Sequence, residues 1–518
     1  MKPLVRTIFT IVSALLLTAA FPRPGWEILA WVAFVPFFYA LKETRFWQGV
    51  GLGVLFGLVH FAAILYWVGY PVYVYAHMPM WAAVGAVFLL SLILSMYMGL
   101  FGGACSLLLP RPVAFLLAAP VFFLATEYLR ATLFSGFPWA LLGASQAEQL
   151  RILQIADIFG VWGISFLIIL GNISIYLMIQ SYITNGRTLA QGERATLLLV
   201  FIFPFLLAVS IFYGNYRIAS IHEALQNAPS VQTAILQGNI QPSLKWDQDH
   251  QVRSVQTYIR LGTSPLAQKA DLVVLPETAM AFQLHHEKAI WSLVQEVVFP
   301  AKAWFVLGAP HWEEINGQRH YYNSAFLANP NGDLVARYDK AHLVPFGEYA
   351  PPIPLGGKVG LPGGSDFTPG VPGRVLQTDK AVLGPQICYE IIFPVYSRLA
   401  TQNGADILVN LTEDGWYGDT AGPRQHFAMV ILRTVENRRS LVRAANTGIS
   451  GFILPTGESI ANTKLNEEAV VMAKLPILTT TTIYQKMGDI LPQTCTIIFV
   501  VWLVAQVVFY VRRKQNFI

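Results

Sequence analysis

The chain has 518 residues, of which 54% are hydrophobic and 13% are charged, whereas about 25% are charged in a typical soluble domain. The charged residues are unevenly distributed, so we expect a membrane-embedded part joined to a water-soluble part. The formal net charge of +5 sits mainly in loops, without a basic stripe interleaved with aromatic residues, which argues against a nucleic-acid partner. Three cysteines, Cys105, Cys388 and Cys495, give no disulfide framework.

Stretches without Asp, Glu, Lys or Arg predict eight membrane spans, of which the first two are short for a bilayer that needs roughly 20 residues. The first could instead be a cleaved signal peptide, because Lys2 and Arg6 precede an apolar run. The second run follows immediately, which favours a helical hairpin. The stretches are 7–21, 28–41, 46–110 (two helices, broken near Tyr70-Pro71 and 77–79), 112–126, 158–186, 195–216 and 490–511.

Lysine and arginine residues in the short loops predict the orientation of these spans. With eight spans, most of these cations fall on one face, which should be cytoplasmic; Arg23, Arg130 and Arg151 fall on the other. We therefore expect a membrane domain of seven helices over 1–216, an outward-facing domain over 217–489, and a last helix with a basic cytoplasmic tail over 490–518. The cations of the majority face are Lys2, Arg6, Lys42, Arg45, Arg111, Arg187, Arg194, Arg512, Arg513 and Lys514.

From residue 231 the pattern changes to short β-branched runs that alternate with helical stretches, which is typical of α/β architecture. Three reactive residues, Glu277, Lys340 and Cys388, follow the ends of expected strands. Ligand sites of α/β sheets lie at that edge. The expected strands are 231–240, 270–275, 304–308, 322–328, 334–338, 382–387 and 406–410, with a hairpin turn at 329–332.

Cys388 ends an apolar run and is followed by Tyr389, Glu390 and a helix-like stretch from Pro394. A strand, a sharp turn and a helix can expose a nucleophile at the amide donors of a helix N-terminus. We expect a cysteine in that position to have a lowered pKa and to be reactive. The alternative is a small core residue at a strand end, because free cysteine is often buried.

Glu277 and Lys340 have ordinary alternatives as well, namely a carboxylate near a helix start and a solvated loop charge. Together with Cys388, however, they supply complementary functions for acyl transfer. A thiol needs a base, which Glu277 could be. A fixed ammonium at Lys340 could stabilise a tetrahedral oxyanion, and the loss of one such donor typically costs about 10²–10³ in rate.

Several motifs resemble those of the nitrilase (carbon–nitrogen hydrolase) superfamily and, within it, the bacterial apolipoprotein N-acyltransferase family. The triad of that superfamily corresponds to Glu277, Lys340 and Cys388. The resemblance implies about eight helices and an αββα sandwich domain inserted before the last of them. The motifs are 275–277, 339–340, 387–390, Lys340-Ala341-His342-Leu343-Val344-Pro345-Phe346-Gly347-Glu348, 237–240, 245–246, 414–418, 425–426 and 446–450.

The resemblance implies a ping-pong transfer in the inner membrane of a bacterium, with the site on the periplasmic face. Cys388 would take an acyl chain from a phospholipid as a thioester and pass it to the α-amine of an S-diacylglyceryl cysteine at a lipoprotein N-terminus. Glu277 would be the base in both halves, and Lys340 would steady the oxyanion. Glu348, Tyr389 and Glu390 would support the triad. No cofactor is implied, and we expect a monomer.

A thioester must survive water, so the site should be apolar and near the bilayer surface. Residues 345–373, rich in Pro and Gly, suit a loop that covers the site, or an ordinary solvent loop. Trp246 and Trp416 could contact acyl chains or only pack. The histidines lack a ligand spacing, which argues against a metal; they are His285, His286, His311 and His320.

Two rival functions remain open. A membrane-tethered amidase or nitrile hydrolase would keep the chemistry and pass the acyl group to water, but would not need eight spans. A transporter or receptor would carry a catalytically dead module. The intact triad argues against it, as does the scarcity of charge inside the spans, with Glu127 as the exception.

Overall fold

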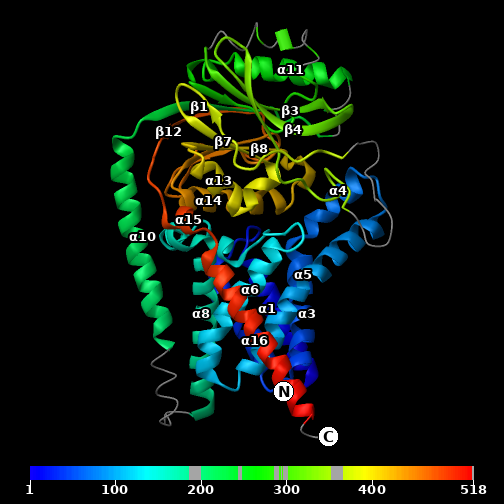
Figure 1. Ribbon diagram of the computed structural model, residues 1–518, viewed down its shortest axis with the longest axis vertical. Coiled ribbons are helices and arrows are strands. Elements are labelled where there is room, and N and C mark those ends of the chain that lie inside the picture. Colours follow the sequence, from blue (N-terminus) through cyan, green and yellow to red (C-terminus); the bar gives the residue numbers. More distant parts are fainter. Residues whose placement is uncertain are drawn as a thin grey trace. The chain divides into compact units, whose positions relative to one another are not determined.

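The structure is a computed structural model of the chain, and it describes residues 1–185, 200–242, 245, 248–284, 287, 291–292, 295, 302–351 and 366–515. The chain divides into two compact units (Figure 1). The helical unit comprises Met1–Gly69, Pro79–Tyr216 and Met487–Ile518, and the sheet unit comprises Tyr70–Met78 and Arg217–Lys486. The sheet unit therefore takes in a short segment that lies between two apolar helices in the sequence.

Six helices among the described residues are long and apolar enough to cross a membrane. They are α3 (Phe46–Ile64), α5 (Met80–Leu108), α6 (Pro112–Thr132), α8 (Ala156–Asn185), α10 (Ile202–Gln226) and α16 (Ile490–Gln515). The first two expected spans are shorter apolar segments, as their length in the sequence indicates: α1 (Pro3–Ala19), then η1 (Glu27–Trp31) with α2 (Val35–Leu41). The expected multi-span helical part is confirmed. Of the eight expected spans, six correspond to helices of span length among the described residues.

Polar side chains of α1 hold the segment that follows it. The Arg6 guanidinium donates to the carbonyls of Ala40 and Lys42, each at 2.7 Å. The Ser13 hydroxyl donates to the carbonyl of Ala33. Because an apolar interior offers no water to these groups, the paired bonds stabilise the two segments against each other. These are the two segments for which the sequence favoured a helical hairpin.

Glycines allow α3 and α5 to pack closely. A Cβ added at Gly53 would lie 2.2 Å from the carbonyl oxygen of Met98, and one at Gly57 would lie 2.7 Å from Cα of Ser95. Small residues at four-residue spacing are typical of such contacts between membrane helices. The break between these helices contains η2 (Tyr66–Val68) and α4 (Gly69–Val74), where the sequence predicted an interruption near Tyr70-Pro71.

The described residues of the sheet unit form two six-stranded sheets. The first has the order β12 (Ala469–Pro476), β1 (Ser230–Gln237), β2 (Leu272–Val274), β3 (Trp304–Ile315), β4 (Gln318–Ala328), β5 (Leu334–Asp339). The second has the order β11 (Ser459–Ile460), β10 (Gly451–Ile453), β9 (Ser440–Ala445), β8 (Ile407–Thr412), β7 (Val382–Ile387), β6 (Leu376–Gln377). Strands β1, β2 and β3 pair in parallel, as do β7, β8 and β9.

Apolar side chains fill the space between the sheets. Ile235 and Val274 from the first sheet pack in one buried cluster with Leu383 and Val409 from the second. On the outer side of the first sheet, α11 (Gln248–Gly262) contributes to a second buried cluster. Helices α13 (Pro394–Gln402) and α14 (Gly422–Asn437) lie along the second sheet (Figure 1). Strands covered on both faces are buried along their whole length, as β8 is, and its sequence is apolar except at Asn410 and Thr412. The expected αββα sandwich is confirmed.

Candidate active site

Cys388 lies where β7 ends, and it opens the short helix η6 (Cys388–Ile392), after which α13 begins at Pro394. Its backbone has a φ of +52°, which non-glycine residues rarely adopt. Such a strained residue persists only where its surroundings fix it, and these residues cluster at functional sites. The strand, turn and helix expected around this cysteine are therefore present.

The expected lowering of the Cys388 pKa is wrong. Burial of the thiol raises its pKa, the Glu277 carboxylate raises it further, and the nearby Lys340 ammonium opposes them only in part. The expectation relied on a helix N-terminus, whereas burial and the neighbouring carboxylate outweigh it here. The resting nucleophile is consequently a neutral thiol at neutral pH, which needs a base at the moment of attack.

We expect alkylation of Cys388 by iodoacetamide to keep accelerating from about pH 7 to about pH 10, because only the thiolate reacts. The raised pKa leaves the thiolate a minor species over that whole range. Labelling is measured by peptide mass spectrometry, with a Cys388→Ser chain to identify signals from the other cysteines. A plateau in the rate below about pH 8 would show that the thiol is already ionised there.

Lys340 follows directly on β5 and is buried. Its Nζ lies 2.9 Å from Oε1 of Glu348 and 3.7 Å from Oε1 of Glu277. Burial lowers the pKa of this ammonium, but the carboxylates of Glu348 and Glu277 outweigh burial and hold the pKa above its usual value. Lys340 is therefore a fixed positive charge next to Glu277, and Glu348, which was expected to support the triad, pairs directly with it.

Glu277 follows β2 and is also buried. Its Oε1 accepts a hydrogen bond from Nδ2 of Asn323 at 2.7 Å, and its Oε2 accepts one from the backbone N–H of Glu413 at 2.9 Å. The side chain is thus held by donors on two sides, as a general base must be if it is to keep one orientation.

Glu390 joins the nucleophile turn to the segment after β5. Its Oε1 accepts from the Tyr338 hydroxyl and from the N–H groups of Ala341 and His342, at 2.6–3.0 Å, and its Oε2 accepts from the N–H of Ile387 at 2.6 Å. Burial raises the pKa of Glu390 to about 7, although the donors oppose that rise. Glu390 therefore positions the backbone on both sides of the site.

The remaining predicted site residues differ in placement. The buried ring of Tyr389 lies 5.1 Å from that of Phe393, so Tyr389 packs beside the nucleophile turn. Trp416 is 39% exposed and meets the Tyr75 ring edge-on at 4.7 Å. Trp246 lies outside the described residues, as do His285 and His286. No group of three His, Cys, Asp or Glu side chains able to hold a metal occurs among the residues that the structure describes.

Part of the loop 345–373 is described. The N–H of Gly370 donates to the carbonyl of Lys340 at 2.9 Å, and the N–H of Thr368 donates to that of Tyr321 at 2.6 Å. These bonds attach the end of the loop to the strands that carry the site. Residues 352–365 lie outside the described residues, so the loop's function as a cover stays a prediction.

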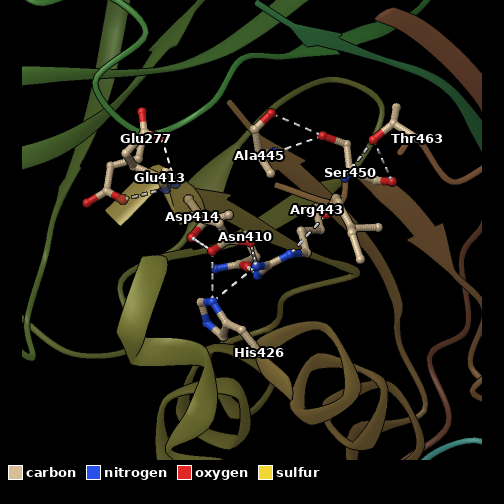
Figure 2. Close-up of polar contacts among 12 residues, drawn as sticks. Glu277, Asn410, Glu413, Asp414, His426, Arg443, Ala445, Ser450 and Thr463 are labelled. Carbon is tan, nitrogen blue, oxygen red and sulfur yellow. Dashed lines mark hydrogen bonds and ion pairs between the residues drawn. The ribbon is translucent and has the colours of Figure 1, made fainter. Parts of the chain in front are cut away.

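A buried charged cluster lies near the nucleophile and contains Asp414, His426 and Arg443 (Figure 2). Nη2 of Arg443 donates to Oδ2 of Asp414 at 2.7 Å, and Nδ1 of His426 lies 3.0 Å from Oδ1. Burial raises the pKa of Asp414, but Arg443 and His426 outweigh it and hold the pKa at about 2. The Thr412 hydroxyl also donates to Asp414, at 3.0 Å. This cluster fixes the residues that follow β8.

Arg443→Met should lower the free energy of unfolding by about 3–5 kcal/mol, because the buried Asp414 carboxylate would lose its main counter-charge. The comparison is a chemical denaturation series on the full chain in detergent micelles. Arg374→Met, at an exposed position, is the matched control. A loss below about 1 kcal/mol would mean that the cluster adds little to stability.

A second buried ion pair, between Lys245 and Glu413, contacts the backbone of Glu277. Nζ of Lys245 pairs with the Glu413 carboxylate and lies 3.3 Å from the backbone carbonyl of Glu277. Nδ2 of Asn446 donates to the same carboxylate at 2.8 Å. Because the N–H of Glu413 binds Glu277, this pair fixes one of the two donors that hold the base; both glutamates appear in Figure 2.

Analysis of the sequence missed several of these residues. Asn323 and Ser324 interrupt an otherwise apolar part of β4, and that interruption is the signal that could have marked Asn323. Tyr75 donates its hydroxyl to the carbonyl of Gly415 at 3.0 Å, from a segment predicted only as a break between spans. A break in an apolar stretch does not reveal its tertiary partner, so no sequence signal pointed to Tyr75.

The two halves of the chain each match a known protein family. A family model described as the apolipoprotein N-acyltransferase N-terminal domain matches residues 13–174, and one described as carbon–nitrogen hydrolase matches residues 232–485. The apolipoprotein N-acyltransferase of Geobacter metallireducens is 37% identical over 94% of this chain and 92% of its own. The chain belongs to the apolipoprotein N-acyltransferase family.

Another member of the apolipoprotein N-acyltransferase family, from Rickettsia bellii, is 29% identical over 92% of this chain and 91% of its own. An amidase from Nesterenkonia sp. matches 48% of this chain and 92% of its own, with 20% sequence identity and a TM-score of 0.37. The two family models and the Geobacter metallireducens relative confirm the resemblance inferred from the motifs. As an apolipoprotein N-acyltransferase family member, the chain is a multi-pass membrane enzyme with a carbon–nitrogen hydrolase domain.

Proposed function

We propose that the chain transfers a fatty acyl chain from a membrane phospholipid to the α-amine of S-diacylglyceryl cysteine at the N-terminus of apolipoproteins. The observation that carries this proposal is the grouping of Glu277, Lys340 and Cys388 at strand ends in a buried site. A thiol, a carboxylate and a fixed ammonium are the groups that a covalent acyl transfer requires. The names of the relatives support the substrate class.

In the first half-reaction, Glu277 accepts the proton of the Cys388 thiol as the sulfur attacks the ester carbonyl of the phospholipid. The raised pKa of Cys388 makes this proton transfer necessary. Lys340 stabilises the tetrahedral oxyanion that forms. When the carbon–oxygen ester bond breaks, the lysophospholipid alkoxide takes the proton from Glu277, which leaves a thioester on Cys388.

In the second half-reaction, the lipoprotein amine attacks the thioester carbonyl, and Glu277 accepts a proton from the nitrogen. Lys340 again faces the oxyanion. The carbon–sulfur bond breaks, the thiolate recovers its proton from Glu277, and the product is an amide. Glu348 keeps Lys340 in place throughout, since its Oε1 lies 2.9 Å from Nζ.

The supporting residues have separate functions in this proposal. Glu390 fixes the backbone before the nucleophile and after β5 through three hydrogen bonds from backbone N–H groups, and it accepts a fourth from the Tyr338 hydroxyl. Tyr389 packs against Phe393 and shapes the pocket. Trp416, partly exposed and backed by Tyr75, contacts the acyl chain, and Trp246 is assigned to the same surface by sequence alone.

We also propose that the enzyme resides in the bacterial inner membrane, with residues 217–489 on the periplasmic side. The distribution of lysine and arginine in the short loops supports this orientation. Residues 1–216 and 490–518 then form the membrane domain and last helix. A cysteine introduced at exposed Asn331 tests the orientation, because a membrane-impermeant maleimide should label it in intact spheroplasts.

The substrate assignment is tested with purified protein, a phospholipid labelled in one acyl chain, and a synthetic S-diacylglyceryl-cysteine peptide. We expect labelled N-acyl peptide and lysophospholipid in equal amounts. A matched peptide with an acetylated N-terminus should accept no label, because its nitrogen is no longer nucleophilic. Labelled free fatty acid at the same rate with or without the peptide would instead identify a hydrolase.

A further inference from the structure

Asn323 lies at the centre of the charged part of the site, although the mechanism above gives it no function. Its Nδ2 lies 2.7 Å from Oε1 of Glu277 and 2.9 Å from Oε1 of Glu348. The side chain is buried, and its backbone carbonyl accepts the N–H of Lys340 at 2.8 Å. One amide group therefore donates to two carboxylates and is attached to the lysine between them.

The position of Asn323 follows from the sheet. On β4, Asn323 pairs with Pro310 of β3, and the next residue, Ser324, pairs with Asp339 at the end of β5. Lys340 follows Asp339 directly, so the register brings Asn323 beside the lysine backbone. The two amide hydrogens of Nδ2 allow one hydrogen bond to each carboxylate.

The acidic groups at this site outnumber the basic groups. Two carboxylates, the buried Glu277 and the partly exposed Glu348, share a single ammonium, Lys340. Like charges close together favour binding of a proton, which would sit on one of the two carboxylates. A hydrogen-bond donor to an ionised group opposes that protonation. Asn323 supplies such a donor to both groups without adding a charge.

We propose that Asn323 is a positioning residue that keeps Glu277 and Glu348 ionised together, so that Glu277 is free to act as the base while Glu348 holds Lys340. This inference rests on the proposed function and deepens it. Asn323 touches neither substrate nor the reacting sulfur in this account, and it acts through the two carboxylates. Its effect should therefore appear in the dependence of the rate on pH.

Other charged or titratable groups also act on Glu277 or Glu348. The N–H of Glu413 donates to Glu277, and the electrostatic influence of the remaining groups reaches one or both carboxylates. All of them are left intact in the variants below, so they act equally in every comparison. These groups are Lys340, His342, Cys388, Glu413 and Tyr417, with Lys245 and Asp414 behind them.

The experiment measures the single-turnover rate of Cys388 acylation by phospholipid from about pH 5 to about pH 9, in the full chain. Asn323→Leu removes the donor. The acidic limb of its pH–rate profile should therefore shift to higher pH by about one unit, which is equivalent to a tenfold loss of rate at a given pH on that limb. The rate near the optimum should fall less. The limb shifts because, without the donor, Glu277 and Glu348 together hold one proton up to a higher pH.

Asn323→Asp should move the acidic limb in the same direction as Asn323→Leu, and further. An ionised carboxylate in place of the amide removes the donor and adds a like charge, and both changes favour a proton on Glu277 or Glu348. The variant should be nearly inactive at low pH and recover activity as the pH rises. Its ratio of the rate at about pH 8 to the rate at about pH 6 should exceed that of the wild type at least tenfold.

Asn331→Asp, at an exposed turn of the same hairpin, is the matched control and should leave the profile unchanged. Shifts of the acidic limb to higher pH in both Asn323 variants, larger in Asn323→Asp, support the inference. Reduced rates with the wild-type profile in both variants, or a shift of the acidic limb to lower pH in either, would overturn it. If Asn323→Leu does not fold, the shift in Asn323→Asp decides alone. A wild-type chain that forms no acyl adduct would instead overturn the proposed function.

Discussion

Replacing Cys388 by serine is expected to reduce acyl transfer by at least about 10³-fold, in line with the loss of a covalent nucleophile in other enzymes. The hydroxyl has a much higher pKa than the thiol, and Glu277 is too weak a base to activate it in a site that already raises the pKa of the thiol. The assay is formation of N-acyl peptide from labelled phospholipid.

Cys495→Ser is the matched control, because Cys495 is a buried cysteine of α16 that has no place in the mechanism. It should keep the wild-type rate. Transfer by Cys388→Ser at a rate within about tenfold of the parent would mean that the acyl chain does not pass through residue 388.

Glu277→Gln is expected to slow both half-reactions by about 10²–10⁴-fold, the usual contribution of a general base. Glutamine keeps the shape of the side chain, but it cannot accept the thiol proton, and its NH₂ group would meet the donors Asn323 and Lys340. The two steps are separated by measuring acylation of Cys388 first and chasing the adduct with acceptor peptide afterwards.

Glu314→Gln, at an exposed position of β3, serves as the control for that change and should react normally. A variant at Glu277 that acylates slowly but transfers the acyl chain at the normal rate would contradict a shared base. In that case a different group would have to accept the proton of the amine.

Much of the fold could be predicted because the two halves of the chain differ so strongly in charge and periodicity. Apolar runs of span length became α3, α5, α6, α8, α10 and α16, and the short β-branched runs became strands of the two sheets. The strands β2, β5 and β7 end within one residue of their predicted ends, whereas β3 continues well past its predicted end to Ile315. Glu277, Lys340 and Cys388 could therefore be assigned to strand ends, but the pairing of β2 and β5 in one sheet and of β7 in the other could not be predicted.

What could not be predicted depends on contacts between distant residues. Asn323 is 46 residues from Glu277 in sequence, and Glu413 is 136 residues from it, yet both donate to the same carboxylate. The pKa of Cys388 was predicted in the wrong direction because a local motif was considered without the burial and the charge around it. Likewise, nothing in the apolar sequence near Tyr75 reveals its bond to Gly415.

The measurement that tests the account most directly is intact mass analysis of the wild-type protein after incubation with phospholipid alone. We expect the mass to increase by one acyl chain, located on Cys388 by peptide mapping, and the adduct to persist until diacylated peptide is added. Addition of the peptide should then remove the adduct and give N-acyl peptide. An adduct on another residue, or transfer of labelled acyl chains without any adduct on Cys388, would contradict it.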